Sequence, residues 1–181
     1  YVGLGTMEFL FDENLNKFYF MEMNTRIQVE HPVTEMVIGK DLVKLQIRIA
    51  YGEKIPPNLN KLTPRGHSIE CRINAEDPLK NFIPSPGIVK EFHSPGGMGI
   101  RVDSHVYSGY KIPPYYDSMI AKVIVHGDNR IDAINRMKQA LNELIIEGPK
   151  TTTDFQKAIM ESDNFKNGDF HTGFLDNFKY P

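Results

Sequence analysis

The sequence predicts an α+β fold in which antiparallel strands and helices follow one another along the chain. Two aromatic-rich runs, Met7–Phe11 and Phe18–Glu22, flank a short polar loop, which is the pattern of a β-hairpin. Short strand-like segments separated by proline and glycine turns fill much of 67–125, and apolar residues recur at helical spacing over 128–147. We therefore expect antiparallel sheets with helices packed against them.

A row of polar side chains begins in the hairpin and continues beyond it. At period two, one face of an extended chain would carry Glu22, Asn24, Arg26, Gln28 and Glu30. Carboxylates, carboxamides and a guanidinium bind metals and oxyanions, so we expect residues 1–30 to be mostly strand and to carry a site. The alternative is an ordinary half-buried strand whose polar face is solvated.

The hairpin also predicts a pair of carboxylates. If Phe11 pairs with Tyr19, then Glu8 lies opposite Glu22 on the same face. Like charges opposite each other destabilise a sheet, so the pair calls for a cation. Oxygen ligands favour Mg²⁺ or Mn²⁺. A slipped register would instead leave Glu8 solvated.

Two helices are expected after the polar row. A short one covers 33–38, and a second begins at an Asp41 N-cap, runs through Ala50 and is closed by Gly52. Residues 53–65 contain three prolines and no periodicity, which indicates a connector.

A second polar row lies on a predicted strand over 67–74. Its polar positions are Ser68, Glu70, Arg72 and Asn74. Arg72 either pairs with Glu70 or acts as a clamp for an anion or enolate.

The rest of the chain predicts more short elements. Strands are expected over 87–93 and between 100 and 125, and helices over 128–147 and 154–162. Apolar and aromatic residues after 84 could fill this region's own core or form an interface: Met98, Ile100, Tyr107, Tyr110, Tyr115 and Tyr116.

Composition excludes several classes of protein. The 181 residues carry a net charge of −2, which gives no general attraction to nucleic acid or anionic membranes. No apolar run approaches the length of a membrane span, and no signal peptide is recognisable. The single Cys71 fits a reducing compartment, so a cytoplasmic location is expected. The chain starts without Met in strand-like sequence, as a piece of a longer polypeptide would.

Four motifs, in chain order, resemble biotin carboxylase, an ATP-grasp enzyme. They are Met21–Glu35, Arg65–Asp77, Pro84–Gly87 and Pro113–Met119. The resemblance covers essentially the whole chain. It implies the end of the ATP-grasp domain over 1–64 and the biotin carboxylase C-terminal domain over 65–181.

The resemblance implies roles in nucleotide and metal binding for the hairpin. Glu8 and Glu22 would hold Mg²⁺ or Mn²⁺ on the ATP phosphates, with Asn24 assisting. Leu10 would touch the adenine side. The family's N-terminal domain, its lid and the lysines that grip ATP have no match in 1–181, so we expect the chain alone to be inactive.

The resemblance also implies the bicarbonate and biotin sites. Arg26, Gln28 and the backbone of Val29 would cradle bicarbonate, and Glu30 would be the base that removes its proton. Arg72 would stabilise the biotin enolate.

The implied parent is most like the biotin carboxylase subunit of bacterial acetyl-CoA carboxylase, which acts in fatty acid synthesis. Its partners would be the biotin carboxyl carrier protein, the carboxyltransferase subunits and a second copy, with Arg101 at the dimer contact. Alternatives are a pyruvate, propionyl-CoA or methylcrotonyl-CoA carboxylase, or a non-catalytic dimerisation module. Carbamoyl-phosphate synthetase is disfavoured, because it carries a different sequence at Gln28–Glu30.

Overall fold

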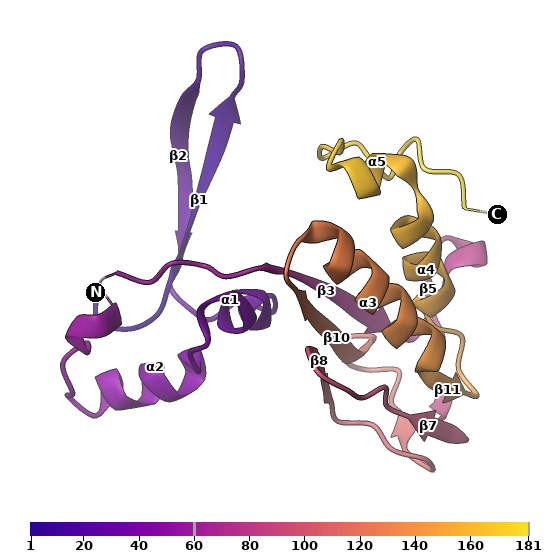
Figure 1. Cartoon of the computed structure of the whole chain (residues 1–181). Coiled ribbons are helices and arrows are strands. Elements are labelled where there is room, and N and C mark those ends of the chain that lie inside the picture. The colour runs from indigo at the N-terminus through magenta and orange to yellow at the C-terminus, as the bar shows by residue number, and fades with distance from the viewer. Residues whose placement is uncertain (60, 181) are drawn as a thin grey trace. The chain divides into compact units, whose positions relative to one another are not determined.

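The computed structural model describes residues 1–59 and 61–180 and divides the chain into two compact units, Tyr1–Arg65 and Gly66–Pro181. Both units combine helices with strands, and all strand pairs in the described residues are antiparallel (Figure 1). The α+β prediction is therefore confirmed.

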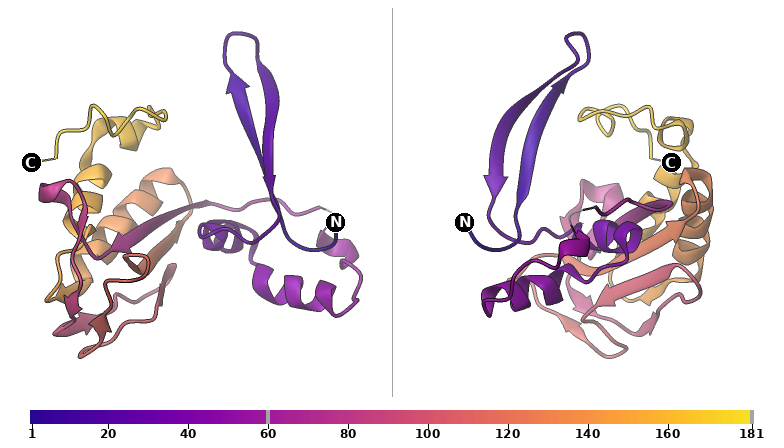
Figure 2. Two further views of the ribbon diagram at one scale, coloured as in Figure 1. Left: turned by 180° about the vertical axis from the view of Figure 1, so that it is seen from behind. Right: turned by 60° about the vertical axis from the view of Figure 1, so that its left-hand side comes forward.

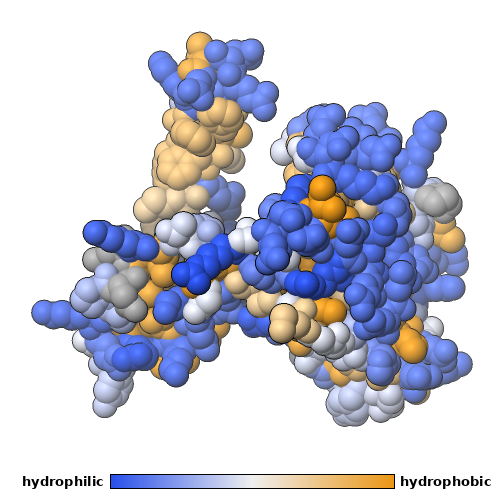
Figure 3. All heavy atoms as spheres, viewed as in Figure 1, coloured by the Kyte–Doolittle hydropathy of each residue, from blue (hydrophilic) through white to orange (hydrophobic). Residues whose placement is uncertain are grey.

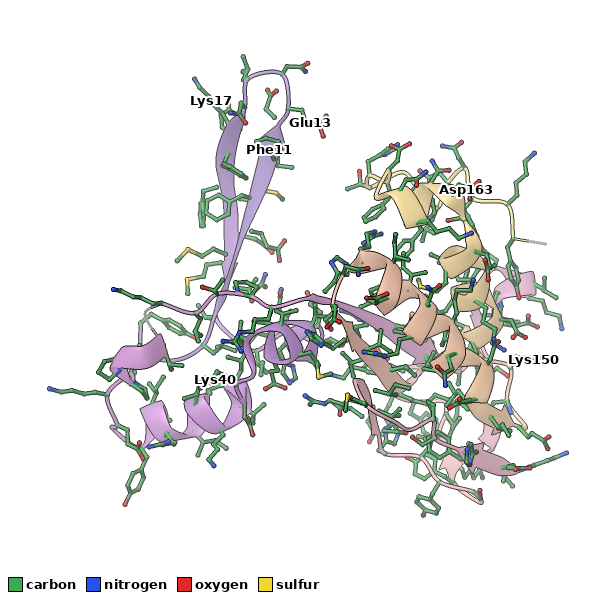
Figure 4. The ribbon with its side chains drawn as sticks, viewed as in Figure 1. Phe11, Glu13, Lys17, Lys40, Lys150 and Asp163 are labelled. Carbon is green, nitrogen blue, oxygen red and sulfur yellow. The ribbon has the colours of Figure 1, made fainter. Side chains whose placement is uncertain are left out.

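The first unit begins with the predicted hairpin. Strand β1 (Thr6–Asp12) pairs with β2 (Lys17–Asn24). The Asp12 carboxylate accepts hydrogen bonds from the backbone N–H groups of Asn14 (2.9 Å) and Leu15 (3.0 Å). An aspartate that binds the backbone just ahead of it folds the chain into a turn. Figure 4 labels Glu13 and Lys17 at this end of the hairpin.

The predicted register of the hairpin is wrong at its tip and right at its base. Phe11 pairs with Phe18, and Tyr19 pairs with the residue before Phe11. The register then shifts by one residue next to Glu8, so that Glu8 does lie opposite Glu22. A β-bulge of this kind puts two residues of one strand against one of its partner.

The hairpin carries an aromatic face that the described residues of its own unit do not cover. The rings of Phe9, Phe11, Phe18 and Phe20 contact one another at centroid distances of 4.7–6.5 Å, and each residue is 47–71% exposed. Figure 3 shows this apolar band along the shaft of the hairpin. In the described part of 1–65, only Pro32 and Glu35 are buried, so this unit has no hydrophobic core of its own.

The predicted strand over the polar row ends early. Strand β2 stops at Asn24, and 25–30 is irregular chain that turns into helix α1 (His31–Ile38). The helix starts two residues before the predicted start because Pro32 suits a first helical turn. The extended-row prediction is therefore wrong beyond Asn24.

The second predicted helix is confirmed. Helix α2 (Leu42–Ala50) has Asp41 as its N-cap, and the Asp41 carboxylate accepts from the Lys44 N–H at 2.7 Å. The buried Glu35 accepts from the Leu42 N–H at 2.7 Å, which ties α1 to the start of α2. The predicted connector holds a single turn of 3-10 helix, η1 (Pro57–Leu59).

The second unit is built on a three-stranded sheet. Strand β10 (Met119–Gly127) lies between β3 (His67–Asn74) and β8 (Ile100–Ser104). Helix α3 (Arg130–Glu143) packs on β10 and β3 (Figure 2). Between sheet and helix lies the core, whose fully buried large side chains include Ile73, Val123, Val125, Met137 and Leu141.

Three pairs of short strands complete the second unit. They are β4 (Glu76–Asp77) with β5 (Ile83–Pro84), β6 (Gly87–Ile88) with β9 (Lys111–Ile112), and β7 (Glu91–His93) with β11 (Ile145–Glu147). A short 3-10 turn, η2 (Pro78–Lys80), follows β4. The single strand predicted over 87–93 is therefore two strands, because the chain changes partners at Val89 and Lys90.

Helix α3 is shorter than predicted. Its N-cap is Asn129, whose side chain accepts from the Asp132 N–H at 3.0 Å, and it ends at Glu143. Leu144 is extended, and the next three residues pair with β7. The apolar period continues through Ile145, but that residue belongs to a strand because it pairs with His93 of β7.

Two helices close the chain. Helix α4 (Thr153–Glu161) starts and ends one residue before the predicted range. Helix α5 (Asp163–Asn167) was not predicted and is capped by Ser162. The Arg130 guanidinium lies over the rings of Phe165 and Phe170, so the C-terminal segment packs on the start of α3.

The aromatic and apolar residues after 84 fall into two groups. Ile100 and Tyr110 pack against the core of the second unit. The other four side chains are 63–92% exposed: Met98, Tyr107, Tyr115 and Tyr116.

Candidate active site

The base of the hairpin gathers four of the predicted site residues. Glu8 and Glu22 are directly opposite each other. The Asn24 amide nitrogen donates to Glu8 Oε1 at 2.7 Å and to Glu22 Oε1 at 3.2 Å. The Gln28 amide nitrogen donates to the same oxygen of Glu8 at 3.2 Å. Two carboxylates are thus held together by neutral amide donors.

This donor set suits a divalent cation. The side-chain amides of Asn24 and Gln28 that donate to the two carboxylates are neutral, so both negative charges remain in place for a cation. The described residues contain no group of three or more His, Cys, Asp or Glu side chains that could bind a metal. Mg²⁺ usually takes one or two protein carboxylates and completes its shell with water and substrate phosphates. The residues therefore fit Mg²⁺ better than an ion that needs a complete protein cage.

The remaining residues of the polar row lie on irregular chain. Arg26 is exposed, and its guanidinium donates to the Ile27 carbonyl at 3.2 Å. Val29 is half-buried. Glu30 is exposed and stands at the N-cap position of α1, where its carbonyl accepts from the Val33 N–H at 3.1 Å. The turn, rather than strand alternation, sets where these side chains lie.

Leu10 lies two residues beyond Glu8 on β1, opposite Tyr19, and is 59% exposed. Alternation along β1 puts it on the same face as Glu8. An exposed leucine beside a carboxylate pair offers an apolar surface to a flat ring.

Arg72 belongs to the second unit. It is exposed on β3, with the buried Cys71 and Ile73 on either side of it in the sequence. Its carbonyl accepts from the Thr152 hydroxyl at 3.3 Å and from the Gln156 amide at 3.4 Å. The start of α4 therefore fixes the backbone that carries Arg72.

Thr152 is a residue that sequence reasoning missed. It is 5% exposed, and its hydroxyl also accepts from the Asn74 N–H at 3.0 Å, while its own N–H donates to the Asn74 carbonyl at 3.0 Å. Thr152 thus forms hydrogen bonds with backbone groups at the edge of β3, as a neighbouring strand would. A run of three threonines at the start of α4 was the only signal in the sequence.

Two titratable groups on β3 differ from their usual behaviour. Burial, and secondarily the charge of Glu70, raises the pKa of the Cys71 thiol to about 12. Cys71 therefore stays protonated and is not a nucleophile. Burial, and secondarily the charge of Arg130, lowers the pKa of His67.

Two family profiles match the chain. Residues 70–177 match the family described as the biotin carboxylase C-terminal domain. Residues 1–58 match the ATP-binding domain of the carbamoyl-phosphate synthase L chain. None of the helices in the described residues is long and apolar enough to cross a membrane.

Known relatives agree with these matches. The chain is 56% identical over 178 residues to biotin carboxylase 1 of Bacillus subtilis, covering 98% of the chain and 40% of the relative. It is 56% identical over 179 residues to a pyruvate carboxylase subunit of Methanothermobacter thermautotrophicus, covering 99% of the chain and 36% of the relative. The chain thus spans about two fifths of their length.

A solved structure shows the same fold. The biotin carboxylase domain dimer of Hydrogenobacter thermophilus 2-oxoglutarate carboxylase, in complex with MgADP, ADP and bicarbonate, is 52% identical with a TM-score of 0.91. The likeness covers 95% of this chain and 38% of that one. The C-terminal profile spans more than half of the chain. The hairpin with its pair of carboxylates precedes this domain in the sequence. The profile match and the similar relatives together show that the chain belongs to the biotin carboxylase family.

Proposed function

We propose that this chain forms the C-terminal part of an enzyme that uses ATP and bicarbonate to carboxylate biotin on its carrier protein. The observation that carries the proposal is the cluster at the base of the hairpin, where Asn24 and Gln28 hold Glu8 beside Glu22. Arg26 and Glu30 alternate in the sequence with Asn24 and Gln28 of this cluster, and they have the charges needed to bind and deprotonate bicarbonate.

Glu8 and Glu22 would hold Mg²⁺, or Mn²⁺ in its place, with Asn24 assisting. When bound, the ion neutralises charge on the ATP phosphates and aligns them for phosphoryl transfer. Leu10 would pack on the adenine side. The complex of the Hydrogenobacter relative with MgADP supports a site for a nucleotide and Mg²⁺.

Arg26, the Gln28 side chain and the Val29 backbone would bind bicarbonate. Glu30 would take its proton, which makes a weak nucleophile able to attack the terminal phosphate of ATP. The attack would release ADP and form carboxyphosphate, which would decompose to CO₂ and phosphate, and that phosphate would take the proton from the biotin ureido nitrogen. Arg72 would then stabilise the biotin enolate that attacks CO₂.

The parent enzyme is proposed to be bacterial acetyl-CoA carboxylase, which acts in fatty acid synthesis in the cytoplasm. The carrier protein and the carboxyltransferase subunits would be its partners. The Methanothermobacter relative, which belongs to a pyruvate carboxylase and has the same 56% identity, makes pyruvate carboxylase the second candidate. Acetyl-CoA and pyruvate, supplied with the matching carboxyltransferase, distinguish the two.

A homodimer through the second unit is also proposed. Met98, Tyr107, Tyr115 and Tyr116 are exposed side chains of the types enriched at interfaces, and Arg101 would lie among the contacts. The Hydrogenobacter relative is a dimer. Sedimentation of the native gene product as a monomer at micromolar concentration would contradict the dimer.

Two variants test the reaction in the native gene product that contains this chain. Glu30→Gln should lower bicarbonate-dependent ATP cleavage by about 100- to 10,000-fold, the usual cost of losing a general base, while ATP binding persists. Arg72→Ala should lower biotin carboxylation far more than ATP cleavage. Glu13→Gln, an exposed carboxylate in the hairpin turn, is the matched control.

The failing outcomes are distinct. If the wild-type protein cleaves no ATP in the presence of bicarbonate, the proposed function is wrong and a non-catalytic dimerisation module is favoured. If Arg72→Ala lowers both rates equally, Arg72 serves bicarbonate or phosphate instead of the enolate.

A further inference from the structure

One face of the three-stranded sheet is charged, although the other face packs against α3. On this charged face the three strands contribute Glu70, Arg72, Arg101, Asp103 and Lys122. Apart from the exposed Ser104, their neighbours along each strand point the other way, into the core or against it. Three cations therefore share the face with two carboxylates, which leaves one net positive charge.

The register puts two of these cations side by side. Lys122 on β10 lies directly opposite Arg72 on β3. Directly opposed side chains of an antiparallel pair have Cβ atoms about 5 Å apart, and like charges at that position destabilise the sheet. The arrangement is the cationic counterpart of the Glu8–Glu22 pair and suits an anion bound by both side chains.

Asp103 holds Lys122 from the other side. It lies opposite Lys122 on β8, with its Oδ2 at 3.8 Å from Lys122 Nζ. Arg101 binds the Asp103 carboxylate through two hydrogen bonds. Its Nε and Nη2 atoms donate to the two carboxylate oxygens of Asp103, each at 2.8 Å. A carboxylate fixed by a two-pronged arginine contact has little freedom, so it fixes the ammonium beside it.

Lys122 differs from Arg72 in exposure. Its side chain is 12% exposed, whereas Arg72 is exposed. A lysine kept largely from water has lost much of its hydration, and the Asp103 carboxylate compensates for part of that loss. Lys122 is also the only charged residue in the otherwise apolar run 119–125.

We propose that Lys122 and Arg72 together bind one small oxyanion, and that Asp103 is a positioning residue for Lys122. Building on the proposed function, that oxyanion is the biotin enolate or the phosphate released from ATP. Both carry negative charge on an exposed oxygen.

The test compares Lys122→Gln with wild type in the native gene product that contains this chain. Biotin carboxylation at saturating ATP and bicarbonate should fall about tenfold or more, because a hydrogen bond to a charged group typically contributes at least that much. Inhibition by added inorganic phosphate should weaken by a similar factor. Bicarbonate-dependent ATP cleavage without biotin should change less than twofold.

Three further variants make the test specific. Lys122→Arg keeps the charge and should restore most of the lost rate. Asp103→Asn leaves Lys122 in place without its anchor, so it should lower carboxylation in the same direction by a smaller factor. Lys138→Gln removes an ion pair on α3, Lys138 Nζ to Glu161 Oε1 at 2.5 Å, and serves as the control that should leave both rates unchanged.

Each outcome decides a point. A loss of carboxylation alone assigns the oxyanion as the enolate, and a change in phosphate inhibition alone assigns it as phosphate. The proposal is overturned if Lys122→Gln stays within twofold of wild type in both measurements, or if Lys122→Arg loses as much as Lys122→Gln. An inactive wild type would overturn the proposed function itself.

Discussion

Glu30 shows how the local backbone differs from the extended row that the sequence predicts. An extended row would place it on the same face as Glu22 and Asn24. In the structure the chain turns after Asn24, and Glu30 starts helix α1. The turn is sharp because the Gln28 carbonyl accepts from the His31 N–H at 3.3 Å. Glu30 is therefore not on β2 with Glu22 and Asn24, and its role as the base stays a proposal.

His67 gives the folded chain a pH dependence. Burial and the Arg130 guanidinium, 3.2 Å from His67 Nε2, lower its pKa, so the unfolded chain binds a proton more readily than the folded one. The stability that neutral His67 allows is present above the usual pKa of 6.5 and is lost as the pH falls below it.

We therefore expect the free energy of unfolding to fall between about pH 7.5 and about pH 5.5, and His67→Gln to flatten that slope. Urea titrations followed by far-ultraviolet circular dichroism measure it. His93→Gln, at an exposed histidine, is the control. An unchanged slope in His67→Gln would remove His67 from this role.

Strand β3 depends on α4 at the scale of elements. It is an edge strand, and β10 satisfies only one of its sides. Thr152 supplies hydrogen bonds to the other side, next to Arg72. The position of the proposed enolate clamp therefore rests on a helix start some eighty residues later in the sequence.

Thr152→Val keeps the shape of the side chain but leaves the Asn74 N–H without its acceptor. A donor left unpaired in this way typically costs about 1–3 kcal/mol, so the free energy of unfolding should fall by that amount. Thr152→Ser retains the hydroxyl and should recover most of it. Chemical denaturation of the three proteins checks this, and equal stability for Thr152→Val and wild type would contradict the bridging role.

The hairpin, unlike strand β3, has no contact from another element that stabilises its open sides in the described residues. Its strands pair well, yet its aromatic face is exposed and neither strand has a second neighbour in the described residues. Isolated two-stranded hairpins are marginally stable in water. A complete ATP-grasp sheet would supply the missing neighbours.

At the scale of the whole molecule, the two units should differ in stability. The second unit has a continuous core between α3 and the sheet, whereas the first buries only Pro32 and Glu35 among its described residues. We expect amide hydrogen exchange of the 181-residue chain to be fast over 1–30 and slow over 119–143. The chain alone should also lack carboxylase activity and bind ATP weakly.

Uniform protection along the chain would contradict this difference. Measurable ATP cleavage by the 181 residues, with biotin and bicarbonate, would likewise show a more complete site than we infer. Cys71 offers an independent probe, because a buried thiol that stays protonated should react with alkylating reagents only when the second unit opens.

Local patterns in the sequence determined much of the fold. The hairpin, the Asp41-capped helix α2 and the polar row on β3 depend on alternation, capping and turns, which act within a few residues. The family resemblance, carried by contiguous motifs such as Pro113–Met119, was equally readable and is confirmed by the family match over residues 70–177. The position of α3 was also predicted, apart from its end.

The tertiary structure decided what depends on partners distant in sequence. A bulge set the Glu8–Glu22 register, and β7 captured the residues that helical periodicity assigned to α3. Strand pairing, which no single segment encodes, brought Lys122 between Arg72 and Asp103. Hydrogen-bond partners across a sheet are chosen by the free energy of the whole fold, so residues far apart in sequence become neighbours only once the strands are paired.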